Sequence, residues 1–325
     1  MSGNAANRLG LPPRIAHALT EPLRHFVVTG GSGWLGRAAL ELLDSVYGKA
    51  LADRVAVFGA DAKWIDLRSG RRIESRPFAE IGNLRRPGPT ILHFAFLTKG
   101  YAAQMPAERY LAVNRGLSAA VANLAERLEA RGLFVPSSGA VYRRDRTLDR
   151  DLAANPYGVL KHEDEERIGE LAARRGFPAV VVRIFNLSGP FMNHAAHYAL
   201  GSILSDILAG RAVTIKADHP VVRSYAHVGD VLSLALDLLV RGDSVAPFDT
   251  GGDPEIEIGA LARRAARLLG QSGLPIERPA FESGPPDSYV GDAVPFCRHA
   301  EAAGLRLRNL DEQIVDTAAF LREAR

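Results

Sequence analysis

Short apolar runs alternate along the chain with longer stretches in which apolar residues recur at helical spacing. The runs rich in valine, isoleucine, leucine and phenylalanine, each typical of a buried strand, are residues 25–29, 55–58, 90–94, 133–135 and 179–184. The longer stretches, each typical of a helix, are residues 36–51, 105–129 and 157–175. Strands that alternate with helices form a parallel sheet covered by helices. The pattern therefore predicts an α/β fold with a doubly wound parallel sheet.

Two segments interrupt this alternation. Residues 64–74 are rich in arginine, and we expect irregular structure there with a hairpin turn at Arg68-Ser-Gly-Arg71. Residues 1–23 lack the apolar core of a secretion signal, so we expect a loose arm or a short helix.

No apolar run in the sequence approaches the length of a membrane span. We therefore expect a soluble, cytoplasmic protein with no membrane partner.

A glycine-rich turn, Gly30-Gly-Ser-Gly-Trp-Leu-Gly36, joins the first strand to the first helix. It can be read as Gly31-x-Gly33-x-x-Gly36, or as Gly30-x-x-Gly33-x-x-Gly36 preceded by a threonine. A strand, a tight turn and a helix N-terminus together present backbone N–H groups and the positive end of the helix dipole to a phosphate. In either register, the turn predicts a dinucleotide-binding site.

Ligands of open parallel sheets bind at the carboxyl ends of the strands, so the residues just past each strand are candidates for the site. These are Asp61, residues 95–98, Ser137 with Ser138, and Asn186. In the helix that follows the serine pair, Tyr157 and Lys161 lie four positions apart and therefore share one helix face.

The Tyr157–Lys161 pair has the chemistry of a general base. An ammonium near a phenol favours the phenolate, which is the form that abstracts a proton from an alcohol. A tyrosine and a lysine at this spacing can also be an ordinary pair on a helix surface. The serine pair before them and the glycine turn upstream favour the catalytic interpretation.

Six segments in a fixed order carry a resemblance that extends from Phe26 over nearly the whole chain. Besides the glycine turn they are Ser137-Ser-Gly-Ala-Val-Tyr142, Pro156-Tyr-Gly-Val-Leu-Lys161, Arg183-Ile-Phe-Asn-Leu-Ser-Gly-Pro190, Arg223-Ser-Tyr-Ala-His-Val-Gly-Asp230 and Asp249-Thr-Gly-Gly252. The chain resembles the extended short-chain dehydrogenases/reductases, the family of NAD-dependent nucleotide-sugar epimerases and dehydratases. The resemblance implies a Rossmann sheet with a smaller C-terminal substrate-binding domain.

The resemblance also implies roles for single residues. Tyr157 would be the catalytic base, Lys161 would tune it and hold the nicotinamide ribose, and Ser138 would hydrogen-bond the reacting hydroxyl. The residues expected to bind the cofactor are Gly30, Gly33, Trp34, Leu35, Gly36, Asp61, Ala95, Asn114, Tyr157 and Lys161. Ser138, Asn186 and Arg223 are expected to touch the substrate, the arginine at its pyrophosphate.

The sequence departs from the family in two places near the expected cofactor. The second strand ends in Phe58-Gly-Ala, where NAD users of the family often place an acid, and Asp61 comes two residues later. Lys63 could instead meet a 2′-phosphate, so NAD is favoured and NADP stays open. The loop after His93 reads Phe94-Ala-Phe96 where small residues are usual, which predicts a tighter cleft.

Composition excludes several other classes of protein. The formal net charge is +3 with arginines scattered along the chain, which is typical of a solvated surface and gives no nucleic-acid-binding block. The single cysteine, Cys297, excludes an internal disulfide and fits a reducing compartment. We expect His93 to be a buried core histidine and His227 to pack against its local surroundings. His194 and His197 lack a third metal ligand, so we expect no metal site.

We expect an arm at 1–23, a dinucleotide-binding domain at 24–186 and 223–252, and a substrate domain at 187–222 and 253–325. The expected function is epimerisation of a nucleotide-diphosphate sugar at C4. The related 4,6-dehydratases carry an acid pair directly after the catalytic Ser or Thr, where this chain has Gly139 and Ala140. An NADPH-dependent ketoreductase and a catalytically idle dinucleotide sensor are the alternatives. The resemblance further implies a homodimer that pairs helices 105–129 and 157–175 of two copies.

Overall fold

The computed structural model describes residues 9–252, 254–281 and 285–323, and these form two compact units. The sheet unit comprises residues 10–184 and 232–248. The C-terminal unit comprises Leu9 and the described residues of 185–231 and 249–325.

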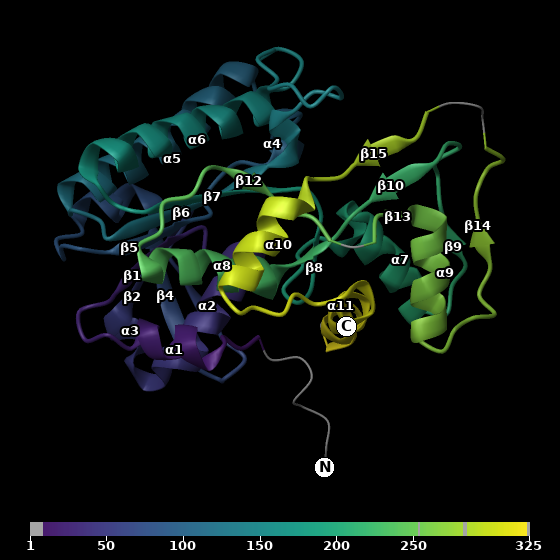
Figure 1. Cartoon of the computed structure of the whole chain (residues 1–325), viewed down its shortest axis with the longest axis horizontal. Coiled ribbons are helices and arrows are strands. Elements are labelled where there is room, and N and C mark those ends of the chain that lie inside the picture. The colour runs from purple at the N-terminus through teal and green to yellow at the C-terminus, as the bar shows by residue number, and fades with distance from the viewer. Residues whose placement is uncertain (1–8, 253, 282–284, 324–325) are drawn as a thin grey trace. The chain divides into compact units, whose positions relative to one another are not determined.

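An eight-stranded sheet forms the centre of the sheet unit (Figure 1). Its strands are β1 (Phe26–Thr29), β2 (Val55–Gly59), β3 (Lys63–Asp66), β4 (Arg72–Pro77), β5 (Thr90–His93), β6 (Gly132–Ser138), β7 (Ala179–Ile184) and β12 (Phe248–Asp249). The strand order is β12-β7-β6-β5-β1-β2-β4-β3. Neighbours from β7 to β4 pair in parallel, and β3 pairs with β4 in the antiparallel sense. The predicted doubly wound α/β sheet is therefore confirmed.

Helices cover the sheet because β1, β2, β5 and β6 are apolar and buried along nearly their whole length. In the sheet unit they are α1 (Pro13–Leu19), α2 (Trp34–Tyr47), α3 (Leu51–Arg54), α4 (Lys99–Ala102), α5 (Ala107–Arg127), α6 (Pro156–Arg175) and residues 232–241 of α8 (Val228–Arg241). Short 3₁₀ turns occupy Gly48–Ala50, Phe78–Asn83 and Gly139–Val141. In Figure 1, α5 and α6 lie side by side on one face of the sheet, and α2 and α8 lie on the other.

The segment 64–74 is not irregular, and that prediction was wrong. Its residues belong to β3 and β4, joined by a turn in which Leu67 N–H donates to the Arg71 carbonyl at 2.8 Å. The hairpin turn expected there is present, with Gly70 at φ +82°. Within the two strands, Ile65, Ile73 and Ser75 are buried, while Trp64, Asp66, Arg72 and Glu74 between or beside them face solvent. The exposed arginines between the buried positions hid this period of two.

The C-terminal unit is built from short strands around three helices. The helices α7 (Ala199–Leu208), α9 (Ile258–Leu268) and α11 (Leu310–Glu323) enclose one apolar core, and the remaining helices are α10 (Ala293–Ala302) and the 3₁₀ turn Ala195–His197. The strands are β8 (Leu187–Ser188), β9 (Val213–Thr214), β10 (Val221–Arg223), β11 (Ala226–His227), β13 (Ile256–Glu257), β14 (Ile276–Glu277) and β15 (Asp287–Tyr289). Within the described residues, none of the helices has the length and hydropathy needed to cross a bilayer.

Candidate active site

The glycine turn between β1 and α2 is shaped by backbone packing. Gly30 adopts φ +69°, and a Cβ there would lie 2.7 Å from Ala95 N and from the Phe94 carbonyl carbon. A Cβ on Gly36 would collide with the Gly30 carbonyl oxygen. Gly31 faces the core, where a Cβ would meet the Val57 side chain. The structure therefore gives Gly30 and Gly36 the tight-turn roles of the second register.

Gly33 differs from its neighbours, because the chain itself leaves room for a side chain there. It is the N-cap of α2 at φ −75°, and the protein atom nearest to a Cβ, the Gly30 carbonyl oxygen, would be 3.4 Å away. Of the described side chains none caps this helix end, and its first turn contains no acid. Neither backbone strain nor packing within the protein requires a glycine at position 33. The space above its backbone at the N-terminus of α2, which we call the glycine cradle, therefore stays open and fits the pyrophosphate of a dinucleotide.

Ser138 and Tyr157 are connected through the start of α6. Ser138 ends β6, and its Oγ accepts a hydrogen bond from Ala140 N at 3.1 Å. Asn155 caps α6, since its Oδ1 accepts from Gly158 N at 3.0 Å. The Asn155 Nδ2 donates to the Ala140 carbonyl at 2.8 Å and to Asp149 Oδ2 at 3.0 Å. One side chain therefore fastens the turn after Ser138 to the helix end that carries Tyr157.

Lys161 lies one turn after Tyr157 and is buried. Its Nζ donates to the Pro136 carbonyl at 2.8 Å, which points the ammonium at the end of β6. Burial lowers the pKa of Lys161 to about 8, and the nearby carboxylates of Asp164 and Glu165 oppose that shift. The ammonium also lies 3.8 Å from the centroid of the Phe96 ring.

Asn114 holds the loop after β5. Its Oδ1 accepts from Leu97 N at 2.8 Å, and its Nδ2 donates to the Leu97 carbonyl at 3.3 Å. The Tyr110 hydroxyl donates to the same carbonyl at 2.8 Å. At the other end of the loop, Ala95 N donates to Thr29 Oγ1 at 3.2 Å. Asn114 thus fixes the backbone of the loop that carries Phe96, and the cofactor contact expected of it stays a prediction.

His93 is buried beneath this loop, as expected for a core histidine. Its Nδ1 is 2.7 Å from Thr29 Oγ1, while its Nε2 has no hydrogen-bond partner among the described residues. Burial lowers the pKa of His93 to about 4, so the ring is neutral near pH 7.

At the end of β2, Asp61 is exposed in the loop and Lys63 begins β3. Sequence reasoning did not identify Arg76, which lies beside Phe58 of β2 because β4 pairs with β2 in parallel. Its guanidinium lies 4.5 Å from the centroid of the Phe58 ring. Arg76 is therefore a further polar side chain at the sheet edge where Asp61 was expected to act.

Asn186 and Arg223 belong to the C-terminal unit, where both contact protein groups. The Asn186 Nδ2 donates to the carbonyls of Ser224 at 3.0 Å and Tyr289 at 3.1 Å. The Arg223 guanidinium donates to the Asp287 carbonyl and to its carboxylate, each at 2.8 Å. Their expected contacts with substrate stay predictions.

The other histidines and the cysteine considered in the sequence lie in the C-terminal unit. His227 is buried 3.5 Å from an Asp316 carboxylate oxygen, and burial lowers its pKa to about 3. His194 and His197 stack with centroids 5.5 Å apart, and the described residues contain no group of three metal-ligating side chains. Cys297 is exposed.

The family model described as the NAD dependent epimerase/dehydratase family matches residues 26–251, which is well over half of the chain. The chain belongs to this family. The fold and the family resemblance expected from the sequence are thereby confirmed, and NAD is the cofactor of the family. The glycine cradle at Gly33 is the feature of this epimerase/dehydratase chain that fits NAD.

Among curated proteins, the chain is similar to UDP-glucuronic acid decarboxylases 5 and 6 of Arabidopsis thaliana. The identities are 30% over 139 residues (41% of this chain, 40% of the relative) and 29% over 121 residues (35% of each). The chain thus spans well under half the length of these relatives.

Three solved structures show the same fold as this family member. The first is a UDP-N-acetylglucosamine 4-epimerase from Methanobrevibacter ruminantium in complex with UDP-N-acetylmuramic acid, with a TM-score of 0.72 and 18% identity over 93% of this chain and 99% of that one. The second is a UDP-glucose 4-epimerase from Thermotoga maritima with UDP-glucose, with a TM-score of 0.69 and 19% identity over 92% of this chain and 99% of that one. The third is a UDP-glucose 4-epimerase from Brucella ovis with NAD, with a TM-score of 0.67 and 20% identity over 91% of this chain and 97% of that one.

Proposed function

We propose that this protein epimerises a nucleotide-diphosphate sugar at C4, using NAD. The observation that carries the proposal is the set of Ser138, Tyr157 and Lys161 at the carboxyl end of β6 and the start of α6. Because β1, β5 and β6 pair in parallel, the turn after β1 and the end of β6 lie at the same edge of the sheet, and open parallel sheets bind their ligands at that edge. The likeness to UDP-sugar 4-epimerases supports the choice of substrate class.

In this proposal the cofactor is held along the sheet edge. The glycine turn with Trp34 and Leu35 would bind the pyrophosphate, and Asp61 would meet the adenosine ribose. Ala95 and the loop fixed by Asn114 would border the nicotinamide side, where Tyr157 and Lys161 would bind its ribose. When bound, NAD would accept a hydride from the sugar carbon and later return it.

The residues of the chain would move only the proton. The Tyr157 phenolate would take the proton of the sugar 4-hydroxyl, which leaves a 4-keto sugar once the C4 hydride has departed. Ser138 would hydrogen-bond the reacting oxygen, and the Lys161 ammonium would stabilise the phenolate. After the keto sugar presents its other face, Tyr157 would give the proton back to the oxygen as C4 is reduced again. The product has the atoms of the substrate.

Two residues after Ser138 favour epimerisation over dehydration. Gly139 and Ala140 lie in the 3₁₀ turn and have no side chain that can donate or accept a proton. An elimination of water would need an acid and a base near C5 and C6. We therefore expect a product of unchanged mass, with no net NADH accumulation and no solvent deuterium at carbon.

Decarboxylation is a second candidate, because the curated relatives of this chain are UDP-glucuronic acid decarboxylases. With NAD as the hydride acceptor and Tyr157 taking the hydroxyl proton, a keto group at C4 would allow a carboxylate on C5 to leave as carbon dioxide while a proton from solvent adds to C5. UDP-glucuronic acid therefore belongs in the substrate panel beside neutral sugars.

The test is a panel of UDP-, GDP-, CDP- and dTDP-sugars, incubated with the protein and either NAD or NADPH and analysed by mass spectrometry and NMR. Epimerisation gives an isomer of equal mass. A loss of about 18 Da shows dehydration, a loss of about 44 Da from UDP-glucuronic acid shows decarboxylation, and stoichiometric NADPH consumption shows a ketoreductase. If cofactor and sugar bind without any reaction, the idle sensor is the correct interpretation.

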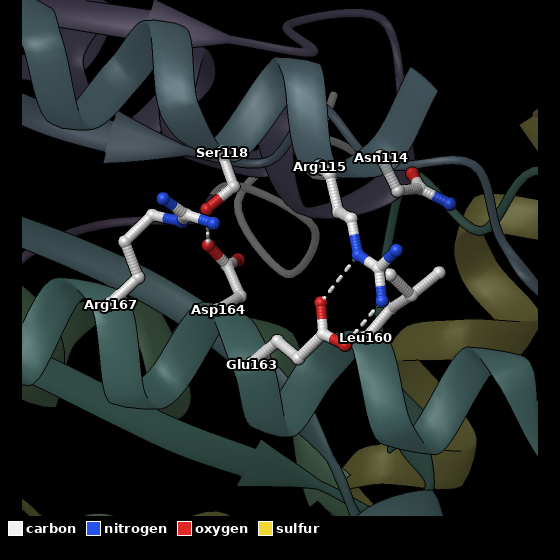
Figure 2. A pocket seen from close by; sticks show the side chains of 7 residues that line it. All are labelled: Asn114, Arg115, Ser118, Leu160, Glu163, Asp164 and Arg167. Atoms are coloured by element: carbon white, nitrogen blue, oxygen red, sulfur yellow. Dashed lines mark hydrogen bonds and ion pairs between the residues drawn. The ribbon is translucent and has the colours of Figure 1, made fainter. Parts of the chain in front are cut away.

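We also propose a homodimer through α5 and α6. These helices are joined by the Arg115–Glu163 ion pair at 2.6 Å and by the Ser118–Asp164 hydrogen bond (Figure 2). A small pocket lies between the two helices and is bordered by residues of both, and the Val113 side chain on α5 is exposed. Pairing the α5–α6 faces of two copies would form a four-helix bundle.

A further inference from the structure

The Phe96 ring contacts both members of the catalytic pair. Lys161 Nζ lies 3.8 Å from the ring centroid, which is within the range of a cation–π interaction. The Tyr157 ring meets the Phe96 ring at a centroid distance of 5.8 Å and an interplanar angle of 81°, an edge-to-face contact. One ring thus joins a buried cation to the phenol that the cation would activate.

The loop holds Phe96 at this position from both sides. Ala95 N donates to Thr29 Oγ1 before it, and both Leu97 backbone groups bond with Asn114 after it. Hydrogen bonds on both sides of Phe96 therefore hold the backbone that carries the ring, so the contact of the ring with α6 is set by the fold of the loop.

Several charged or titratable groups near Lys161 act on its ammonium besides the Phe96 ring. On α6, Asp164 bonds with Ser118, and Glu165 forms an ion pair with Arg183 at 2.6 Å. On β5, His93 is neutral, because burial lowers its pKa to about 4. Both carboxylates raise the pKa of Lys161 although each also bonds another side chain, and the Phe96 ring adds its electron-rich face at 3.8 Å from the ammonium.

We propose that Phe96 is a positioning residue that keeps Lys161 charged and holds the Tyr157 ring against it. The inference rests on the proposed function, since it assigns Phe96 to the pair that would perform the proton transfer. A leucine would keep the apolar bulk over Lys161 but would offer no π face. The ammonium would then lose stabilisation without gaining access to water.

The experiment measures the pKa of Lys161 directly in the ligand-free protein. The chain contains five lysines, so ¹³Cε-lysine labelling gives a small set of NMR signals, and Lys161→Met assigns the one of interest. We expect Phe96→Leu to weaken proton binding by Lys161 by about 3- to 30-fold, the range that a desolvated cation–π contact predicts. Phe96→Tyr keeps the ring and should restore the titration of the original protein.

Phe94→Leu is the matched control, because Phe94 lies in the same loop but packs against Phe134 with centroids 5.8 Å apart. It should leave the Lys161 titration unchanged. An unchanged titration in Phe96→Leu, or an equal change in Phe94→Leu, overturns the proposal. No turnover is needed, so this result is separate from the substrate panel, in which absence of any reaction would refute the proposed function.

Discussion

The contrast between Gly33 and Gly36 allows cofactor binding to be separated from folding with one kind of substitution. At Gly33 the backbone is in an ordinary region, and a Cβ would meet protein at 3.4 Å, an ordinary van der Waals distance. Gly33→Ala should therefore change the free energy of unfolding by less than about 1 kcal/mol. A methyl group in the cradle should still weaken NAD binding by about 100-fold or more, since the pyrophosphate requires close approach to the backbone.

Gly36→Ala is the opposite case. Its Cβ would collide with the Gly30 carbonyl oxygen, a backbone atom that cannot rotate away. The turn and α2 must separate, and we expect a loss of about 2–4 kcal/mol in the free energy of unfolding. Urea denaturation followed by circular dichroism measures stability, and calorimetric titration with NAD measures binding. Full NAD affinity in Gly33→Ala would refute the cradle, and normal stability in Gly36→Ala would refute the packing argument.

Three further predictions concern the pair on α6 and the helix faces. Tyr157→Phe should lower turnover by about 10²–10⁴-fold with little change in NAD affinity, because the hydroxyl acts in proton transfer; rates from a coupled assay that matched the original protein would exclude Tyr157 as the base. Lys161 has a pKa of about 8 in the folded protein, below that of a lysine in the unfolded chain, so the unfolded state binds more protons above pH 8. The free energy of unfolding should thus rise relative to Lys161→Met between about pH 8 and 10, by on the order of 1 kcal/mol per pH unit, and parallel curves from chemical denaturation would contradict this. Light scattering at micromolar concentration should give twice the 35.0 kDa chain mass, and a monomer alone would reject the proposed α5–α6 dimer.

Local patterns were sufficient for most of the sheet unit. The apolar runs at 25–29, 55–58 and 179–184 form the strands β1, β2 and β7 because most of their residues are β-branched or aromatic. Helix α5 begins at Ala107, two residues later than expected, because Pro106 precedes its first turn. Gly176, at φ +73°, ends α6 as its sequence predicts.

Contacts between distant segments could not be predicted from such patterns. Phe96 was noted only as a bulky residue in a loop, and its position over Lys161 depends on how β5 and α6 pack. The pairing of Arg223 with Asp287 joins two strands 64 residues apart. Arg76 was missed because only the parallel pairing of β4 with β2 brings it to the ligand edge of the sheet.

The close approach of Gly30 to Phe94 and Ala95 has a thermodynamic consequence. The turn that would bind the pyrophosphate touches, backbone to backbone, the loop that carries the ring over Lys161. Displacement of either segment must displace the other, because neither has a side chain at this contact that could rearrange. Substitutions that displace the turn should therefore be non-additive with substitutions in the loop, and a double-mutant cycle between positions 36 and 96 would measure their coupling free energy.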